Sequence, residues 1–442
     1  MLSELQNSVI ETDVCIIGAG VSGVPAAIAA ARNGAKVVLV EEDMLCGGGP
    51  VDNFLVMPCG GPITGIYREM LTMLNAGFDL KNEPLPGEKP CFEDGKNHFW
   101  QPSSYARVIG QMLRAEDGIT VLNGCLCTGA KTKDGRNGKR VTEAILHNGA
   151  NRKIHVGAKA FVDTTGTAAF AALCGSALRY GQETKSESGE RLAPESVQDV
   201  ENNVMPCTWM YIAERTYGTE LPPLSEFREY NREPGFVENK LHNWATALPE
   251  EYIKRNTGQY IVWGTTLVCP DTYDLSQLGQ TQQKAQELIE YNLQVWNRYG
   301  FSVHLAPKMG VRETARIVGE ETITLEYLEK GEQPKDTIAY IQSGVDLWQS
   351  SFDDNDAALK TAGVPYRALI PKNLDGLLVA GKSISCTRIA MSAYRMQPIV
   401  AAVGQAAGTA AALCAADGVG VREVDIPALK SILKKDCVKG DF

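Results

Sequence analysis

The chain has 442 residues, of which 44% are hydrophobic and 22% are charged, and its formal net charge is −10. This length supports a large buried core and two or three domains. The acidic balance excludes a protein that collects phosphates along a nucleic-acid backbone, because such proteins carry a basic excess.

The first elements of the chain predict a nucleotide-binding α/β unit. Residues 13–17 form a short apolar run that is typical of a buried strand, and an Ala-rich helix follows to about Asn33, with Gly34 as its stop. Residues 36–40 predict a second buried strand. This alternation of strand, helix and strand favours a doubly wound parallel sheet.

The turn between the first strand and the helix reads Gly18-Ala19-Gly20-Val21-Ser22-Gly23. In this setting the pattern indicates a dinucleotide site. The first glycine permits a tight turn, the second lets the backbone approach a pyrophosphate, and the third lets the helix pack on the strand. The helix N-terminus, with Val21 and Ser22, would offer N–H groups to the phosphates. Pro25 is compatible with this helix only near its first turn.

Two acidic residues, Glu41 and Glu42, stand at the end of the second strand, and both are candidate cofactor contacts. We expect Glu41 to accept hydrogen bonds from ribose hydroxyls, and its charge would repel a 2′-phosphate, which disfavours NADP at this site.

The rest of the chain predicts further elements and a division into domains. Residues 47–62 read as a loop, 63–75 and 103–115 as helices, 121–131 and 140–146 as neighbouring strands, 158–163 as a buried strand, 281–299 as an amphipathic helix, 377–380 as a strand and 398–416 as a small-residue helix. We predict a discontinuous Rossmann-type nucleotide-binding domain, residues 1–180 and 350–442. An α+β substrate domain, residues 181–349, would be inserted between its parts.

Four segments beyond the glycine motif carry a resemblance to a known family. They are Cys46-Gly47-Gly48-Gly49, Val162-Asp163-Thr164-Thr165-Gly166, the run from Met309 to Arg316, and a C-terminal set that comprises residues 364–367, 378–381 and 404–408. With these segments in this order, the sequence resembles the FAD-dependent oxidoreductases of the glutathione-reductase-like fold. The resemblance implies an FAD-binding Rossmann-type domain.

The resemblance also implies which residues contact FAD. Gly47, Gly48, Thr165 and Gly166 would let the chain pass close to the cofactor. The backbone of Cys127 would face the adenine, and Ala380 and Gly381 would approach the ribityl and phosphate side. The helix N-terminus at Pro398, Ile399 and Val400 would face the pyrimidine end of the flavin, where it stabilises negative charge on the reduced ring.

The candidates for the chemistry follow residue 384. Arg388 and Arg395 would clamp a carboxylate or another anion, unless they pair with nearby acids. Tyr394 would donate a proton, or else serve as a buried structural residue. If the run containing Arg312 and Arg316 is helical, these two side chains share one face, either at the active site or in an ion-pair network with acids such as Glu313.

The chain departs from many members of the family at two places. Asp346-Leu347-Trp348 and Ser385-Cys386-Thr387-Arg388 stand where those members carry a histidine. Two acid/base residues are therefore absent. For Cys386, a redox thiol and a packed small residue are the alternatives, and the packed residue is favoured.

The remaining expectations concern metals, partners and the reaction class. The twelve cysteines and five histidines have no metal-ligand spacing, so no metal site is predicted. A second nucleotide motif is missing from the sequence, so electrons would come from the substrate, a redox partner protein or a nicotinamide bound in another way. The chain is expected to be a cytoplasmic enzyme that spans no membrane, forms a homodimer and transfers hydride between flavin N5 and a small polar, anionic metabolite. A flavin monooxygenase or oxidase, and an electron-relay subunit, remain as alternatives.

Overall fold

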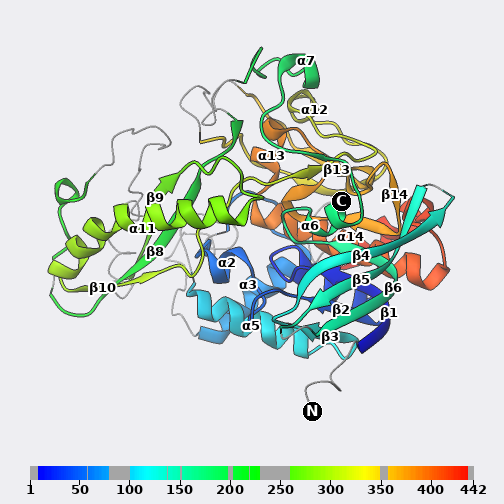
Figure 1. Cartoon of the computed structure of the whole chain (residues 1–442), viewed down its shortest axis with the longest axis horizontal. Coiled ribbons are helices and arrows are strands. Elements are labelled where there is room, and N and C mark those ends of the chain that lie inside the picture. Colours follow the sequence, from blue (N-terminus) through cyan, green and yellow to red (C-terminus); the bar gives the residue numbers. More distant parts are fainter. Residues whose placement is uncertain are drawn as a thin grey trace.

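The protein is described from a computed structural model (Figure 1). The structure describes residues 8–56, 58–78, 100–136, 138–149, 152–197, 203–218, 220–228, 259–348 and 357–436. Its helices are α1 (Gly23–Arg32), α2 (Gly49–Asp52), α3 (Gly65–Phe78), α5 (Pro102–Arg114), α6 (Ala169–Leu173), α7 (Lys185–Ser188), α11 (Leu275–Arg298), α12 (Leu325–Lys330), α13 (Arg388–Tyr394), α14 (Gln397–Asp417) and α15 (Ile426–Asp436). Its strands are β1 (Ser8–Ile17), β2 (Val37–Val40), β3 (Ile119–Leu122), β4 (Leu126–Gly135), β5 (Gly138–His147), β6 (Lys153–Asp163), β7 (Leu178–Arg179), β8 (Cys207–Arg215), β9 (Gln259–Leu267), β10 (Phe301–Leu305), β11 (Arg316–Ile317), β12 (Thr337–Ile341), β13 (Ala362–Pro365), β14 (Leu374–Asp375) and β15 (Leu377–Val379).

The largest sheet combines a parallel part with an antiparallel part. Strands β3, β2, β1 and β6 lie side by side and run parallel. On the other side of β6, β5 and then β4 continue the sheet in antiparallel fashion. Because β5 covers only the first half of β6, the short strand β15 can pair in parallel with its second half, where Leu377 lies opposite Phe161.

The sheet therefore takes strands from both ends of the chain, with β1 to β6 from the first 163 residues and β14 and β15 from residues 374–379. This confirms the predicted α/β fold class, a parallel sheet of the FAD-binding Rossmann type. The exact domain boundaries stay a prediction.

Both faces of the sheet are covered, which explains why its central strands are continuously apolar. In β1, Val14 and Ile16 join the core that contains α1, α3, α5 and α14, while Cys15 and Ile17 join the core on the opposite face. β2 alternates in the same way, because successive side chains of a strand point to opposite faces.

Helix α14 passes close to α1 because glycines replace side chains at the crossing. A Cβ atom built on Gly404 would lie 2.1 Å from the Ser22 carbonyl oxygen, and one on Gly408 would lie 2.0 Å from the Ala26 carbonyl oxygen. By length and composition alone α14 could cross a membrane, yet 83% of its most apolar stretch is buried inside the protein. Core packing thus accounts for the small-residue composition that the sequence shows.

A second, smaller sheet is antiparallel throughout. β8 lies between β9 and β10 in an antiparallel arrangement, and α11 packs on it around the buried Trp296. Figure 1 shows this unit beside the large sheet. It corresponds to part of the predicted inserted segment.

One prediction of local structure is wrong, and the condition attached to another is not met. The single strand expected over residues 121–131 is split between β3 and β4, because the chain turns at residues 123–124. The run containing Arg312 and Arg316 is extended rather than helical. Gly310 exchanges backbone hydrogen bonds with Thr208, and Arg316 pairs with Arg179 of β7, so contacts with distant segments fix an extended backbone there.

Candidate functional site

The first glycine motif forms a tight turn between β1 and α1. Gly18 has φ +100°, and a Cβ atom there would lie 2.7 Å from the Thr164 carbonyl oxygen. A Cβ on Gly23 would lie 1.8 Å from the Gly18 carbonyl oxygen. Pro25 falls in the first turn of α1, where its ring is tolerated. Larger residues are therefore excluded at Gly18 and Gly23, and α1 begins directly after the turn.

The second glycine segment closes over the first. The Gly47 N–H donates to the Ala19 carbonyl oxygen at 2.8 Å. Gly48 has φ +56°, and a Cβ there would lie 2.9 Å from the Gly20 Cα. The two loops thus meet backbone to backbone, which leaves room for a ligand only along main-chain atoms.

Glu41 lies at the end of β2 beneath the glycine turn. One carboxylate oxygen accepts from the Ala19 N–H at 2.7 Å and the other from the Asp43 N–H at 3.2 Å. Burial raises the pKa of this carboxyl group to about 7, against the lowering effect of the two N–H donors. Glu42 is more exposed and lies 3.5 Å from the ammonium of Lys308. The expected ribose contact of Glu41 stays a prediction.

Asp163 organises the loop that follows β6, a role that the sequence analysis missed. Its buried carboxylate accepts from the N–H and the hydroxyl of Thr165 at 2.9 and 2.7 Å, and from the N–H of Ala171 at 2.8 Å. Next to it, Thr164 donates its hydroxyl to the Gly18 carbonyl oxygen at 2.6 Å. An Asp directly before two threonines and a glycine at a strand end was the signal that could have identified this loop-holding role.

The structure brings the predicted cofactor residues together. Those at the carboxyl ends of β1, β2, β6 and β15 are Gly18, Gly20, Val21, Ser22, Gly23, Glu41, Thr165, Gly166, Ala380 and Gly381. A Cβ on Gly381 would lie 3.5 Å from the Ser22 Cβ, so the last strand meets the glycine turn. In an open parallel sheet, ligands bind at this edge.

Buried hydroxyl groups at this edge lack partners. Ser22 Oγ and Ser383 Oγ are buried and have no hydrogen-bond partner among the described residues. Buried polar groups in proteins are normally hydrogen-bonded, so unpaired hydroxyls beside a glycine cradle indicate a polar ligand. The cradle and these donors fit the pyrophosphate and ribityl parts of FAD.

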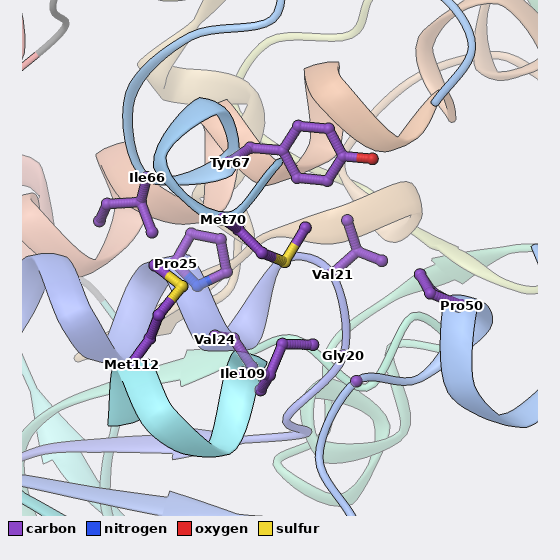
Figure 2. A pocket seen from close by; sticks show the side chains of 11 residues that line it. Gly20, Val21, Val24, Pro25, Pro50, Ile66, Tyr67, Met70, Ile109 and Met112 are labelled. Carbon is purple, nitrogen blue, oxygen red and sulfur yellow. The ribbon is translucent and has the colours of Figure 1, made fainter. Parts of the chain in front are cut away.

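An apolar pocket borders the glycine turn on its helical side. Its lining residues are Gly20, Val21, Val24, Pro25, Gly47, Pro50, Ile66, Tyr67, Met70, Ile109 and Met112. Figure 2 shows Gly20 and Pro50 at one end of this pocket and Met112 and Ile66 at the other. The apolar walls offer no partners to phosphate groups, so backbone N–H groups would have to bind them.

Two further predicted cofactor contacts lie at the ends of the site. Cys127 is in β4, and it is close enough to Asp163 for that carboxylate to contribute to the raised pKa of its thiol, of which burial is the main cause. Pro398, Ile399 and Val400 occupy the first turn of α14, whose Gln397 accepts a hydrogen bond from the Tyr67 hydroxyl at 3.1 Å. Whether these groups contact FAD stays a prediction.

Arg388 and Tyr394 occupy buried structural positions. The Arg388 Nε donates to Glu313 at 2.7 Å, and Arg316 pairs with the same carboxylate at 3.1 Å. The Tyr394 hydroxyl donates to the Gly381 carbonyl oxygen at 2.6 Å. These contacts favour the structural alternatives for both side chains over the anion clamp and the proton donor.

Arg395 is differently placed, at the residue before the N-cap of α14. Two hydrogen bonds from Nη2 reach Asp346, at 2.6 Å to the carboxylate and 3.0 Å to the carbonyl oxygen. Its Nε is buried and has no partner within the described part of the chain. The Nε of Arg395 can therefore still donate a hydrogen bond to a ligand beside the predicted flavin end of the site.

The described thiols and potential metal ligands bear on the predictions for Cys386 and for metals. Cys386 is fully buried, and burial raises the pKa of its thiol to about 12, which favours the packed residue. Within the described ranges, no group of three or more His, Cys, Asp or Glu side chains is arranged to hold a metal ion.

Among the solved structures that match this chain are a reductase-like protein, a hydroxylase and an FAD-dependent halogenase. The geranylgeranyl bacteriochlorophyll reductase-like protein of Thermoplasma acidophilum is 12% identical, with 97% of this chain and 83% of that chain covered and a TM-score of 0.40. The anhydrotetracycline hydroxylase OxyS of Streptomyces rimosus is 13% identical, with 97% and 66% covered and a TM-score of 0.43. The myxobacterial chondrochloren halogenase CndH is 10% identical, with 96% and 79% covered and a TM-score of 0.42.

At these values the structural likenesses carry no argument about the reaction. A search among curated proteins finds no relative. The decisive match is the family model described as FAD dependent oxidoreductase, which covers residues 13–433. The chain therefore belongs to the FAD-dependent oxidoreductase family, and FAD is its cofactor.

Proposed function

We propose that this enzyme oxidises or reduces a small, polar, anionic metabolite by hydride transfer between the substrate and flavin N5. Bound FAD supplies the hydride chemistry, and the protein binds and orients the two partners. The observation that carries the proposal is Arg395, whose buried Nε, directly before α14, has no hydrogen-bond partner among the described residues. A guanidinium is suited to holding a carboxylate in one orientation.

The other residues of the site have supporting tasks. The glycine turns at Gly18–Gly23 and Gly47–Gly48 hold the pyrophosphate through main-chain N–H groups, and Glu41 holds the ribose. The N-terminus of α14 favours negative charge on the reduced ring. The positions of the glycine turns, of the first turn of α14 and of the Glu41 carboxylate support these tasks.

The proposal is tested by anaerobic reduction of the FAD-loaded protein. We expect small hydroxy or saturated carboxylic acids to bleach the flavin spectrum, or unsaturated or keto acids to restore it after chemical reduction. The reduced protein should reoxidise slowly in air. Fast reoxidation in air, without electron exchange with any such acid, would instead support the oxidase or monooxygenase alternative. Reoxidation only by a co-purifying protein would support the electron-relay alternative.

A further inference from the structure

Three cationic side chains from separate segments lie near the predicted flavin end of the site, where the charge of Arg395 acts on both Arg312 and Lys382. The ammonium of Lys382 donates to the carbonyl oxygen of Val311, the residue before Arg312, at 2.6 Å. Tyr394 and Gly381, the residues before Arg395 and Lys382, are joined by a hydrogen bond of 2.6 Å. We call Arg312, Lys382 and Arg395 the basic cluster.

Arg312 is fixed by contacts on three sides. It donates to the Pro206 carbonyl oxygen at 2.8 Å and to the Thr208 hydroxyl at 2.6 Å. Its guanidinium also lies 3.9 Å from the centre of the Trp348 ring. Trp348 has φ +58°, which is unfavourable for a bulky residue, and such strain tends to persist at functional sites.

The basic cluster carries an excess of positive charge. Its acidic partner is Asp346, which pairs with Arg395 at 2.6 Å. Glu313 is nearby, but it belongs to a separate ion-pair network with Arg316, Arg388 and Glu183. The two arginines and two glutamates of that network balance each other's charges. The three positive charges of the basic cluster and the single negative charge of Asp346 leave two positive charges uncompensated within the described residues.

This excess is energetically unfavourable in the free protein. Burial, followed by repulsion from Arg395, lowers the pKa of Lys382 to about 8 and that of Arg312 to about 9. Cys207 faces both groups but stays neutral, because burial raises the pKa of its thiol to about 12. A doubly charged anion would offset the excess.

The basic cluster adjoins the predicted cofactor site, because Lys382 follows Gly381 and packs beside Gly166, two of the predicted FAD contacts. A Cβ on Gly166 would lie 3.6 Å from the Lys382 Cε, which places the ammonium group beyond the end of β6. Arg395 directly precedes the first turn of α14, the element predicted to face the flavin ring. Arg312 comes from outside the segments predicted to bind FAD. An anion held here would lie on the substrate side.

From this geometry we propose that Arg312, Lys382 and Arg395 form the substrate site, and that the substrate is a small dicarboxylate. This inference rests on the proposed function and names its substrate class. One carboxylate would take the buried Nε of Arg395, and the other would lie between Arg312 and Lys382. Neither Arg312 nor Lys382 needs to change its contacts with the protein backbone, since both have further donors.

Equilibrium binding to the oxidised FAD-loaded protein tests the proposal without turnover. Succinate is titrated by calorimetry and by its perturbation of the flavin spectrum, with acetate and neutral succinamide as matched ligands. We expect saturable succinate binding, weaker acetate binding and no succinamide binding. Succinate binding should weaken above about pH 8, as Lys382 loses its proton.

Charge-removing variants identify the residues. Arg312→Met and Lys382→Met should each weaken succinate binding by roughly 10- to 100-fold, which corresponds to one charge-assisted hydrogen bond. Lys382→Arg, which keeps the charge, should retain most of the binding. Arg367→Met is the control, because that arginine lies on the surface, paired with Asp336 and Glu321, and should bind succinate as the parent does.

Several outcomes would overturn the inference. They are equal binding of succinamide, unchanged binding in both Met variants, and preferential binding of inorganic phosphate over succinate. Loss of FAD from the Met variants, with no succinate binding by the parent, would assign the cluster to the cofactor instead. Succinate binding that follows these rules in a protein that exchanges electrons with no acid would uphold the site and refute only the proposed function.

Discussion

At the residue scale, Glu41 connects the glycine turn to the nucleotide site. Its pKa of about 7 reflects the burial of its carboxylate. Ribose donors would stabilise the charged form, so FAD binding should release a proton below pH 7. FAD affinity should therefore rise between about pH 5 and pH 7 and level off above.

The variant Glu41→Gln tests this role. It should weaken FAD binding by roughly 10- to 100-fold, the effect of losing a charged acceptor, and should remove the rise with pH. Fluorescence titration of FAD at several pH values measures both effects. If Glu41→Gln keeps the parent's pH dependence, Glu41 is not the titrating group.

Glu313 is predicted to stabilise the folded core by neutralising two buried arginines. Its carboxylate pairs with Arg316 and Arg388 and accepts the Met205 N–H at 2.8 Å. Glu313→Gln would leave two buried arginines undercompensated, so we expect a loss of about 3–5 kcal/mol in the free energy of unfolding.

Urea unfolding measures this loss, and Glu329→Gln is the matched control. Glu329 pairs with the half-exposed Arg191, so its removal should cost about 1 kcal/mol or less. Equal losses in the two variants would contradict the structural role of the Glu313 network.

At the element scale, the contact between α1 and α14 depends on glycine. Gly408→Ala would place a methyl group 2.0 Å from the Ala26 carbonyl oxygen and push the helices apart. We expect a loss of about 1–3 kcal/mol in stability. Gly279→Ala is the control, since this exposed glycine of α11 has no atom within 4 Å of the added Cβ and should gain about 0.5–1 kcal/mol. Thermal or urea unfolding compares them, and similar changes would contradict the close helix contact.

Elements with local signals were predictable from the sequence. Short local patterns predicted the glycine turn, the apolar strands β1 and β2, and the small-residue helix α14. The run around Arg312 does not, because its extended form depends on Gly310 pairing with Thr208 about a hundred residues away. Sequence reasoning also missed Lys382, since a single lysine after Gly381 gives no sign that its ammonium donates to the carbonyl oxygen of Val311, next to Arg312.

The candidate site shows the same division. Motif spacing predicted the cofactor residues, and the structure gathers most of them at one sheet edge. Motif spacing could not place Arg388 in its buried ion pair with Glu313, because that pairing is a property of the folded core.

At the scale of the whole molecule, FAD should stabilise the fold, because it would bind both ends of the chain at the same sheet edge. A ligand at 100 times its dissociation constant adds about 2.7 kcal/mol to the free energy of unfolding. We expect a rise in melting temperature on adding FAD. Gly48→Ala, which forces a Cβ to within 2.9 Å of the Gly20 Cα, should abolish the rise. An equal rise in that variant would place FAD elsewhere.

The most direct test of the central claim is the visible spectrum of the purified full chain after incubation with FAD and gel filtration. The account predicts flavin bands that elute with the parent protein and are lost from the folded Gly48→Ala variant. A parent protein that elutes without flavin would contradict the assignment of this chain as an FAD-dependent oxidoreductase.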